Sequence, residues 1–430
     1  MSVTTNKALR HLMIYQVYVR NYSDQGTFQA VTDDLERIRD LGTDILYLLP
    51  IHPIGAIKRK GTLGSPYSIQ DYFAVNTELG SLDDFKTLID ATHQQGMKIM
   101  MDIVFNHTSY DSVLLKEHPE FFYKNNNGEF ANRVGDWWDI TDLDYTQDPA
   151  LWTYLIDNLV YWTKLGVDGF RFDVASFLPL AFLEQAKDAV LEVNPESIWL
   201  SESVHGAFLK TFRDLGFEAL SECEIYQVFD MAYDYDTHDA FFAYIKQEGT
   251  LQAYVDWVML QEQIYPKNYV KMRNLENHDF GRIAGMLKND LTLIKQWHAF
   301  TFFNKGATMI YAGGEFTDHK HPDLFNKDTI ITTGTDISDL IRLCKDIVQD
   351  PIFAQGVYQL DKADNKDVLV GTYTSEEKTV LGVFNVSHAQ GKIKVNQKDG
   401  TYSNLITGEN VTIKDGSIVL TEAPMIIEID

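Results

Sequence analysis

The stretch GVDGFRFD, from Gly166 to Asp173, is a short apolar run that ends in an arginine and an aspartate two positions apart. In a β-strand, residues i and i+2 point to the same face, so Arg171 and Asp173 should project together from one strand end. A guanidinium beside a carboxylate lowers the pKa of that carboxylate and keeps it ionised. The stretch therefore predicts either a positioned, reactive aspartate or a structural ion pair, and the rest of the chain must distinguish the two.

Apolar runs and amphipathic segments alternate on both sides of this stretch. Buried parallel strands read as continuous apolar runs, and crossover helices show a 3.6-residue period. The expected strands are 14–19, 45–49, 98–104, 169–172, 198–200, 270–274 and 307–311, with an ambiguous sixth strand near 228–233. The expected helices are 28–41, 82–95, 151–164, 180–193 and 291–303. About eight such units over roughly 300 residues is the length of a (β/α)8 TIM barrel, an α/β fold.

Two departures from this alternation divide the chain into domains. About forty residues rich in Asn, Asp, His and aromatic side chains follow the third strand, and irregular segments of that length tend to be functional. We expect them to form a small inserted subdomain at 108–145, between barrel segments 1–107 and 146–350. After an expected helix at 337–348, short alternating strands separated by turn residues predict a C-terminal antiparallel β-sandwich domain at 351–430.

The overall composition excludes several classes of partner. The net charge of −25 argues against nucleic acid and anionic membranes, since both repel an acidic surface. The first twenty residues lack the apolar run of a secretory signal, and no later segment reads as a transmembrane helix. The two cysteines, Cys223 and Cys344, form no metal-ligand pattern and are expected as buried thiols. These features predict a cytoplasmic location, while no feature argues for or against a homo-oligomer.

Polar groups follow the ends of four expected strands. In a β/α barrel the chemistry lies at the C-terminal ends of the strands, so these groups should meet on one rim. Polar groups buried together cost free energy unless they are used, which makes a purely structural role for all of them a poor explanation. The groups are Asp102, Asn106 and His107 after the third strand, Arg171 and Asp173 after the fourth, Glu202 after the fifth, and His278 and Asp279 after the seventh.

Two carboxylates in unlike environments can share the work of breaking a glycosidic bond. One stays ionised and attacks the anomeric carbon, while the other carries a proton and donates it to the leaving oxygen. Asp173, next to Arg171, suits the first role. Glu202 has no basic neighbour in the sequence and follows an apolar run, so it suits the second.

The segments DIVFNH (102–107), GFRFDVA (169–175), the Glu202 segment and NHD (277–279) resemble, in this order, the four signature regions of the α-amylase family of glycoside hydrolases. Weaker similarities are GSPYSIQDY (64–72), DLDY (142–145) and GATMIYAGGE (306–315). The resemblance covers nearly the whole chain. It implies that Asp173 is the nucleophile, that Glu202 is the general acid/base, and that Asp279 is a third carboxylate that grips sugar hydroxyls.

The same resemblance implies roles for residues that bind the substrate. His107 and His278 are similar to hydroxyl ligands of the reacting sugar. Asp102 and Arg171 are similar to partners that hold the nucleophile in place. Tyr67 resembles the aromatic platform under that sugar, and aromatic faces stack on the apolar faces of pyranoses.

The chain departs from the family pattern just after Asp173. Many relatives carry Lys-His there, and this chain has VASF (174–177), which puts in doubt both the leaving-group contacts and a structural calcium. Asn106 is a candidate calcium ligand, because Ca²⁺ takes carbonyl and carboxylate oxygens, and equally a hydrogen-bonding asparagine. The acidic segment 136–144 is either a second source of ligands or a sugar-binding rim. Trp137 and Trp138 within it are expected either to stack on sugars at outer subsites or to pack the subdomain.

The sequence thus predicts a retaining α-glycoside hydrolase that cleaves α-1,4 bonds in maltodextrins or starch-like glucans. No cofactor is expected to be required, and calcium binding stays open. One alternative is a transglycosylase or sugar isomerase of the same family, such as a glucanotransferase or an enzyme that forms trehalose or sucrose isomers. The other is a non-catalytic carbohydrate-binding relative, which the retention of all three carboxylates disfavours.

Overall fold

The computed structural model describes residues 5–134, 136–204, 206–363 and 366–429. Parallel strands close into a barrel in the order β1-β10-β9-β8-β7-β6-β3-β2. The predicted (β/α)8 TIM barrel is therefore confirmed. Residues 1–4 and 430, at the outer limits of the expected barrel and C-terminal domains, lie outside the described residues. The barrel strands are β1 (Met13–Val17), β2 (Ile45–Leu48), β3 (Lys98–Ile103), β6 (Gly169–Phe172), β7 (Ile198–Ser201), β8 (Met231–Tyr233), β9 (Lys271–Arg273) and β10 (Ala307–Tyr311).

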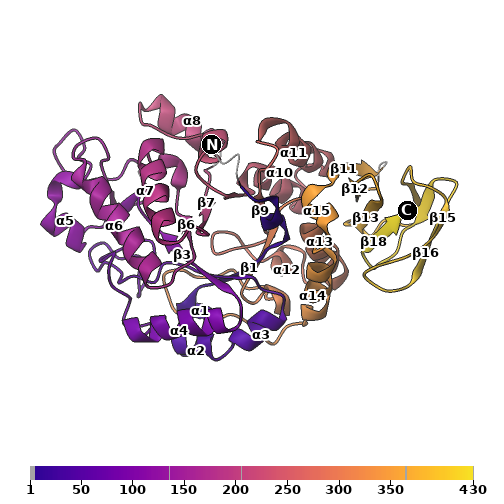
Figure 1. The fold of residues 1–430 in the computed structure, drawn as a ribbon, viewed down its shortest axis with the longest axis horizontal. Coiled ribbons are helices and arrows are strands. Elements are labelled where there is room, and N and C mark those ends of the chain that lie inside the picture. The colour runs from indigo at the N-terminus through magenta and orange to yellow at the C-terminus, as the bar shows by residue number, and fades with distance from the viewer. Residues whose placement is uncertain (1–4, 135, 205, 364–365, 430) are drawn as a thin grey trace.

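Helices surround this barrel (Figure 1). The longest are α4 (Leu82–Gln94), α6 (Ala150–Lys164), α7 (Leu180–Val193), α10 (Tyr235–Ile245), α11 (Leu251–Ile264), α13 (Leu291–Phe303) and α14 (Ser338–Ile347). Shorter ones are α1 (Val19–Tyr22), α2 (Phe28–Thr32), α3 (Leu35–Asp40), α8 (Gly206–Asp214), α9 (Glu222–Ile225), α12 (Ile283–Met286) and α15 (Pro351–Gln355). None of the helices among the described residues is long and apolar enough to cross a membrane.

The expectation of one helix over 28–41 is wrong, because the chain forms α2 and α3 with a break between them. At the break Asp34 adopts φ −109° and ψ 5°, outside the helical range. Its carboxylate accepts hydrogen bonds from the hydroxyl of Tyr22 and from Nε of Arg37, the latter at 2.9 Å. These contacts with other side chains hold Asp34 in place at the break between the two helices. The sixth strand, ambiguous in the sequence, is β8, at the end of the range expected for it.

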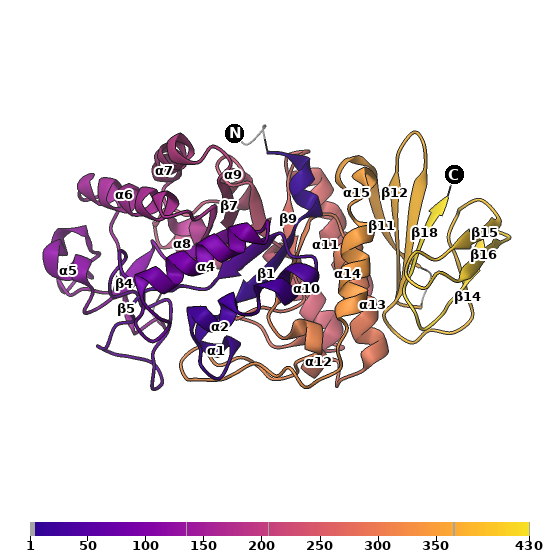
Figure 2. The same cartoon turned by 60° about the horizontal axis from the view of Figure 1, so that its bottom comes forward.

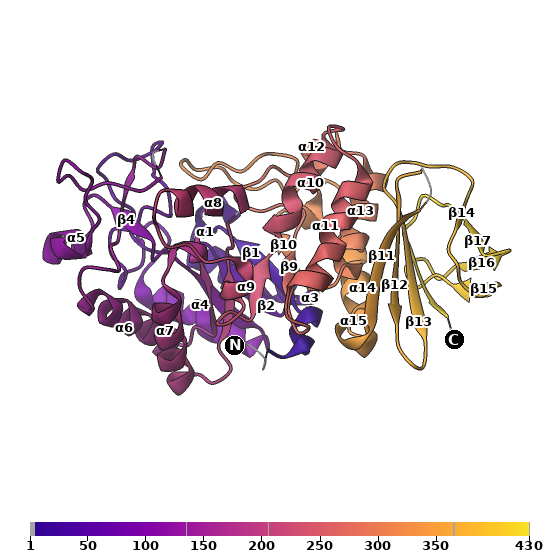
Figure 3. The ribbon, with the colours of Figure 1, turned by 90° about the horizontal axis from the view of Figure 1, so that it is seen from above.

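The segment between β3 and α6 folds outside the barrel. It contains a two-stranded antiparallel sheet, β4 (His107–Ser109) and β5 (Ile140–Asp142), and the short helix α5 (Val113–Glu117). His107 lies opposite Asp142 in this sheet, so the start and the end of the insertion are pinned together at the mouth of the barrel. The insertion and the C-terminal sheets lie at opposite ends of the molecule (Figures 2 and 3).

The C-terminal part of the chain forms two antiparallel sheets. The first contains β11 (Val357–Ala363), β12 (Val368–Thr374), β13 (Thr379–Asn385) and β18 (Met425–Ile429), in this order. The second has the order β14 (Lys392–Lys394), β17 (Ser417–Val419), β16 (Asn410–Lys414) and β15 (Gly400–Ser403). Apolar side chains from both sheets, such as Leu381 and Ile418, pack into one buried cluster between them, which gives the two-layer arrangement of a sandwich.

The first C-terminal sheet docks on the barrel helix α13 through a pair of glycines. Gly371 on β12 and Gly382 on β13 lie directly opposite each other. The ring of Phe303, at the end of α13, occupies the space above them, since a Cβ built on either glycine would come within 2.8 Å of that ring. Phe303 is fully buried, and the hydroxyl of Tyr373 donates a hydrogen bond to its carbonyl oxygen (3.1 Å). Close packing without voids at this junction fixes the sheet against the barrel.

This junction predicts the effect of adding one methyl group. Gly371→Ala should lower the free energy of unfolding by about 1–3 kcal/mol, the usual penalty for overpacking a tight core. In a Phe303→Leu background the extra penalty of the same substitution should shrink, because the smaller side chain leaves room for the Cβ. Gly206→Ala is the control, as a Cβ there meets nothing within 4 Å. Denaturant unfolding of the four variants measures these differences, and an unchanged penalty in the Phe303→Leu background would contradict the steric account.

Candidate active site

A fully buried guanidinium on β6 joins three carboxylates from three neighbouring strands. Nη1 of Arg171 lies 2.8 Å from Oδ1 of Asp102 and 3.0 Å from Oδ1 of Asp173, and Nη2 lies 2.9 Å from Oε2 of Glu202. The barrel register produces this arrangement, because Asp102 on β3 lies directly opposite Arg171. The structure therefore brings together the arginine and the two carboxylates that are expected to react. Arg171 contacts Glu202 as well as Asp173, which lies two positions away in the sequence.

The expected effect of Arg171 on Asp173 is outweighed by burial. Burial raises the pKa of Asp173 well above its ordinary value, the negative charge of Glu202 raises it further, and the charge of Arg171 only opposes the rise. The expectation that the guanidinium keeps this pKa low is therefore wrong. Burial of Asp173 and the nearby negative charge of Glu202 together therefore outweigh the single guanidinium.

Glu202 is held by a strained backbone as well as by Arg171. The N–H of Val174, directly after the expected nucleophile, donates a hydrogen bond of 2.8 Å to Oε2 of Glu202. Val174 adopts φ 37° and ψ 45°, in the left-handed region that a β-branched residue rarely visits. Such strain costs about 1–3 kcal/mol and persists where surrounding contacts enforce it, typically at functional sites. The strained turn thus aims one backbone donor at the carboxylate of Glu202.

The hydroxyl of Tyr67 connects the aromatic platform to the charged cluster. It donates to Oδ2 of Asp102 (3.0 Å) and lies 2.6 Å from Nε2 of His278, whose ring stacks on the Tyr67 ring at 5.4 Å. Burial is the main cause that lowers the pKa of His278, to about 4. Nδ1 of the same ring lies 3.1 Å from the amide nitrogen of Gln16 on β1. The His278 ring, kept neutral by its lowered pKa, is therefore held by contacts at both of its nitrogens.

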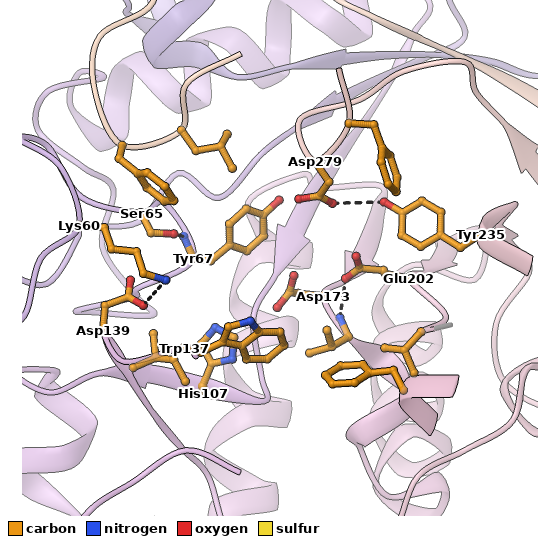
Figure 4. Close-up of a pocket in the computed structure, with 17 residues that line it drawn as sticks. Lys60, Ser65, Tyr67, His107, Trp137, Asp139, Asp173, Glu202, Tyr235 and Asp279 are labelled. Carbon is orange, nitrogen blue, oxygen red and sulfur yellow. Dashed lines mark hydrogen bonds and ion pairs between the residues drawn. The ribbon is translucent and has the colours of Figure 1, made fainter. Parts of the chain in front are cut away.

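Asp279 and His107 complete the set predicted from the sequence. The Asp279 side chain is 38% exposed and accepts a hydrogen bond of 3.2 Å from the hydroxyl of Tyr235, the first residue of α10. Burial, aided by the charge of Lys60, lowers the pKa of His107 to about 3. Both residues line the same pocket as Tyr67 and the reactive carboxylates (Figure 4).

That pocket has a volume of about 420 Å³. The sequence did not single out several residues that line it, among them Lys60, Tyr235, Leu324 and Phe325. The sequence could have indicated Tyr235 as a residue of the site, because it comes two residues after the end of the sixth barrel strand. The sequence left open whether Trp137 and Trp138 bind sugars or pack the subdomain. Trp137 lines the pocket, with its ring 5.7 Å from that of His107, whereas Trp138 is 50% exposed.

The side of the pocket next to Glu202 is apolar. Val174, Val204 and Phe208 line it, and Phe208 packs on Phe177, with 5.4 Å between ring centroids. Phe177 is the last residue of the stretch that replaces the Lys-His of many relatives. This side of the pocket therefore presents apolar side chains, and the stretch that follows Asp173 supplies no lysine or histidine to it.

The residues around Asn106 do not fit a calcium ion. Asn106 is not among the residues that line the pocket, and its amide nitrogen lies 3.1 Å from Nδ1 of His107 and 3.5 Å from Oδ1 of Asp142. The other oxygen of Asp142 accepts from the backbone N–H (2.8 Å) and Nη1 (3.3 Å) of Arg133. Asp139 pairs with Lys60 at 2.8 Å. Ca²⁺ takes six to eight oxygen ligands, but both buried acids of this segment already have a basic partner, and the described residues contain no group of three His, Cys, Asp or Glu that could hold a metal.

Comparisons with known proteins agree with this geometry. The family model of the alpha amylase catalytic domain matches residues 14–138 and 122–352, and that of the bacterial alpha amylase C-terminal domain matches 359–427. The chain therefore belongs to the α-amylase family. An alpha-amylase from Lactobacillus plantarum is 42% identical over 99% of this chain and 100% of that one, with a TM-score of 0.95. A noncanonic maltogenic alpha-amylase from Thermotoga neapolitana is 31% identical over 98% and 99% of the two chains, with a TM-score of 0.87.

Two curated relatives extend the comparison. An intracellular maltogenic amylase from Bacillus subtilis is 26% identical over 89% of this chain and 65% of its own length. An alpha-1,4-glucan:maltose-1-phosphate maltosyltransferase from Burkholderia pseudomallei is 36% identical over 46% of this chain and 19% of its own length. The chain thus spans less than two thirds of each of these two relatives.

The pairing of Asp142 with Arg133 predicts how the fold responds to a chelator. Incubation with excess EDTA should leave the melting temperature unchanged. Arg133→Met should lower it, because it leaves a buried carboxylate unpaired, at a cost of about 3–5 kcal/mol when a buried pair is broken. Lys124→Met, which removes an exposed cation of the same insertion, is the control. A loss of stability in EDTA that added calcium restores would contradict the assignment of Arg133 as the partner of Asp142.

Proposed function

We propose that the protein is a retaining α-glycoside hydrolase that cleaves α-1,4-glucosidic bonds in maltodextrins. The observation that carries the proposal is the binding of Asp173 and Glu202 to the two terminal nitrogens of Arg171 at one pocket wall. Carboxylates that share one guanidinium are close neighbours, which suits double displacement better than the wide gap of inverting enzymes.

The proposed reaction assigns one task to each group. Asp173 attacks the anomeric carbon while Glu202 gives its proton to the leaving glycosidic oxygen, and a glycosyl ester forms on Asp173. Glu202, now ionised, then takes a proton from an incoming water that displaces the sugar and restores Asp173. Asp279 and His107 hold hydroxyls of the same sugar, while the Tyr67 ring supports its apolar face.

The raised pKa of Asp173 fits this cycle. In the proposed cycle the two carboxyl groups enter with one proton between them, and attack by Asp173 requires that this proton lies on Glu202. Burial and the charge of Glu202 raise the pKa of Asp173 well above its ordinary value. Arg171 then stabilises whichever carboxylate is ionised. A sugar that displaces water from the pocket strengthens these interactions, because charges act more strongly where the dielectric constant is low.

A glycosyl transfer activity is the second candidate. The apolar wall formed by Val174, Val204 and Phe208 favours a bound sugar over ordered water beside Glu202, and one relative is named a maltosyltransferase. The relatives named intracellular maltogenic amylases support action on maltodextrins within the cytoplasm.

Maltosyl fluoride separates the roles of the two carboxylates, because fluoride leaves without a proton. Glu202→Gln should release about one fluoride per active site in a burst and then stall, since no base remains to activate water. Mass spectrometry should find the added maltosyl group on the peptide that contains Asp173. Asp173→Asn should show no burst and should lose activity by roughly 10⁴-fold, the order seen when one member of a catalytic set is removed. An ester on another residue would refute the assignment.

Maltotriose distinguishes hydrolysis from transfer. A hydrolase should give glucose and maltose in equal amounts throughout the time course, because water alone accepts the glycosyl group. A transferase should give products longer than maltotriose early in the reaction, which chromatography of timed samples would detect. Dominant longer products at low substrate concentration would replace the hydrolase proposal with the transfer activity.

A further inference from the structure

The wall of the pocket opposite Glu202 is built from three separate segments of the chain. Lys60 lies in the loop between β2 and α4, Asp139 in the insertion, and Phe325 in the loop between β10 and α14. All three side chains line the pocket. Figure 4 shows Lys60 and Asp139 on one side of Tyr67, with Glu202 and Tyr235 on the other.

Backbone and side-chain contacts tie these segments together. The Lys60 ammonium lies 2.8 Å from Oδ1 of Asp139, whose side chain is only 4% exposed. The backbone N–H of Leu63 donates to the carbonyl oxygen of Phe325 (3.0 Å), and the N–H and hydroxyl of Thr62 donate to Oδ1 of Asn326 (3.0 and 2.8 Å). The ammonium also lies 5.8 Å from the centroid of the Phe325 ring. These contacts join the three segments at this end of the pocket, and we call the group of Lys60, Asp139 and Phe325 the clasp.

The clasp lies on the side of the pocket away from Glu202, which indicates the part of the substrate that it contacts. In the proposed function, Glu202 protonates the leaving oxygen, so its side of the pocket receives the leaving group. The opposite side, at Lys60, receives the sugar that becomes attached to Asp173. Lys60 lines the same pocket as His107, which contacts that sugar in the same proposal, so the ammonium lies on the side of the reacting unit.

We propose that the Lys60–Asp139 pair, backed by Phe325, stops the glucan chain on this side and binds the hydroxyls of its non-reducing end. The inference rests on the proposed function and adds the direction of attack. The ammonium donates to the terminal hydroxyls and the Asp139 carboxylate accepts from them, which a glucan continuing past this point does not offer. The enzyme then works inward from chain ends and releases short products.

A blocked substrate tests this inference. The probes are p-nitrophenyl α-maltoheptaoside and the same compound with its two terminal non-reducing hydroxyls bridged by an ethylidene group. Wild-type protein should degrade the bridged compound at least about tenfold more slowly, the scale of discrimination that a lost polar contact and a steric clash produce together. Equal rates for the two compounds in the wild-type protein would overturn the inference. No cleavage of the open compound would instead refute the proposed function, so the two failures are distinguishable.

Variants of the clasp residues provide a second test of this inference. Lys60→Met should raise the ratio of bridged to open rates several-fold, whereas Lys60→Arg, which keeps the ion pair, should not. The double variant Lys60→Met/Asp139→Asn removes both charges and covers the case in which an unpaired buried Asp139 prevents folding. Lys58→Met is the matched control, because Lys58 is exposed in the same loop and its ammonium lies 3.7 Å from the Tyr110 ring. An unchanged ratio in both folded Lys60→Met variants would overturn the assignment to the clasp.

Discussion

The guanidinium of Arg171 is the interaction on which the site depends. It lies inside a closed barrel, fully excluded from water, and is within 3.0 Å of three carboxylates from β3, β6 and the end of β7. Removal of the arginine would leave three buried carboxylates without compensation, which is among the most destabilising changes a protein core can undergo. Stability of the barrel mouth and reactivity of the site therefore rest on the same side chain.

The same dependence bears on the different tasks that we propose for Asp173 and Glu202. One positive charge shared among several negative ones leaves the cluster short of compensation, so a proton is retained. The strained N–H of Val174 adds a donor on the Glu202 side only, and Tyr67 adds one on the Asp102 side. A backbone N–H favours the ionised form of a carboxylate, so in the proposed cycle the Val174 donor stabilises Glu202 after it has given up its proton.

The barrel and most of the residues that line its pocket could be predicted from the sequence, because apolar runs mark the barrel strands and the strand ends mark the mouth of the barrel. The predictions that failed were those that depend on packing between distant segments. The pKa of Asp173 was expected from its neighbour Arg171 alone, while burial and Glu202, 29 positions away in the sequence, reverse the direction. No sequence pattern indicated that Lys60 lies at the pocket, since only the folded loops bring it there. Tyr235 was missed because the strand before it was ambiguous.

The glycine pair beneath Phe303 has a consequence for the evolution of the chain. The sheet that carries Gly371 and Gly382 is shaped to one ring on a barrel helix, and that helix leads directly into β10 and the loop of Phe325. A C-terminal module transplanted from a relative would need matching glycines at both positions to seat against this helix.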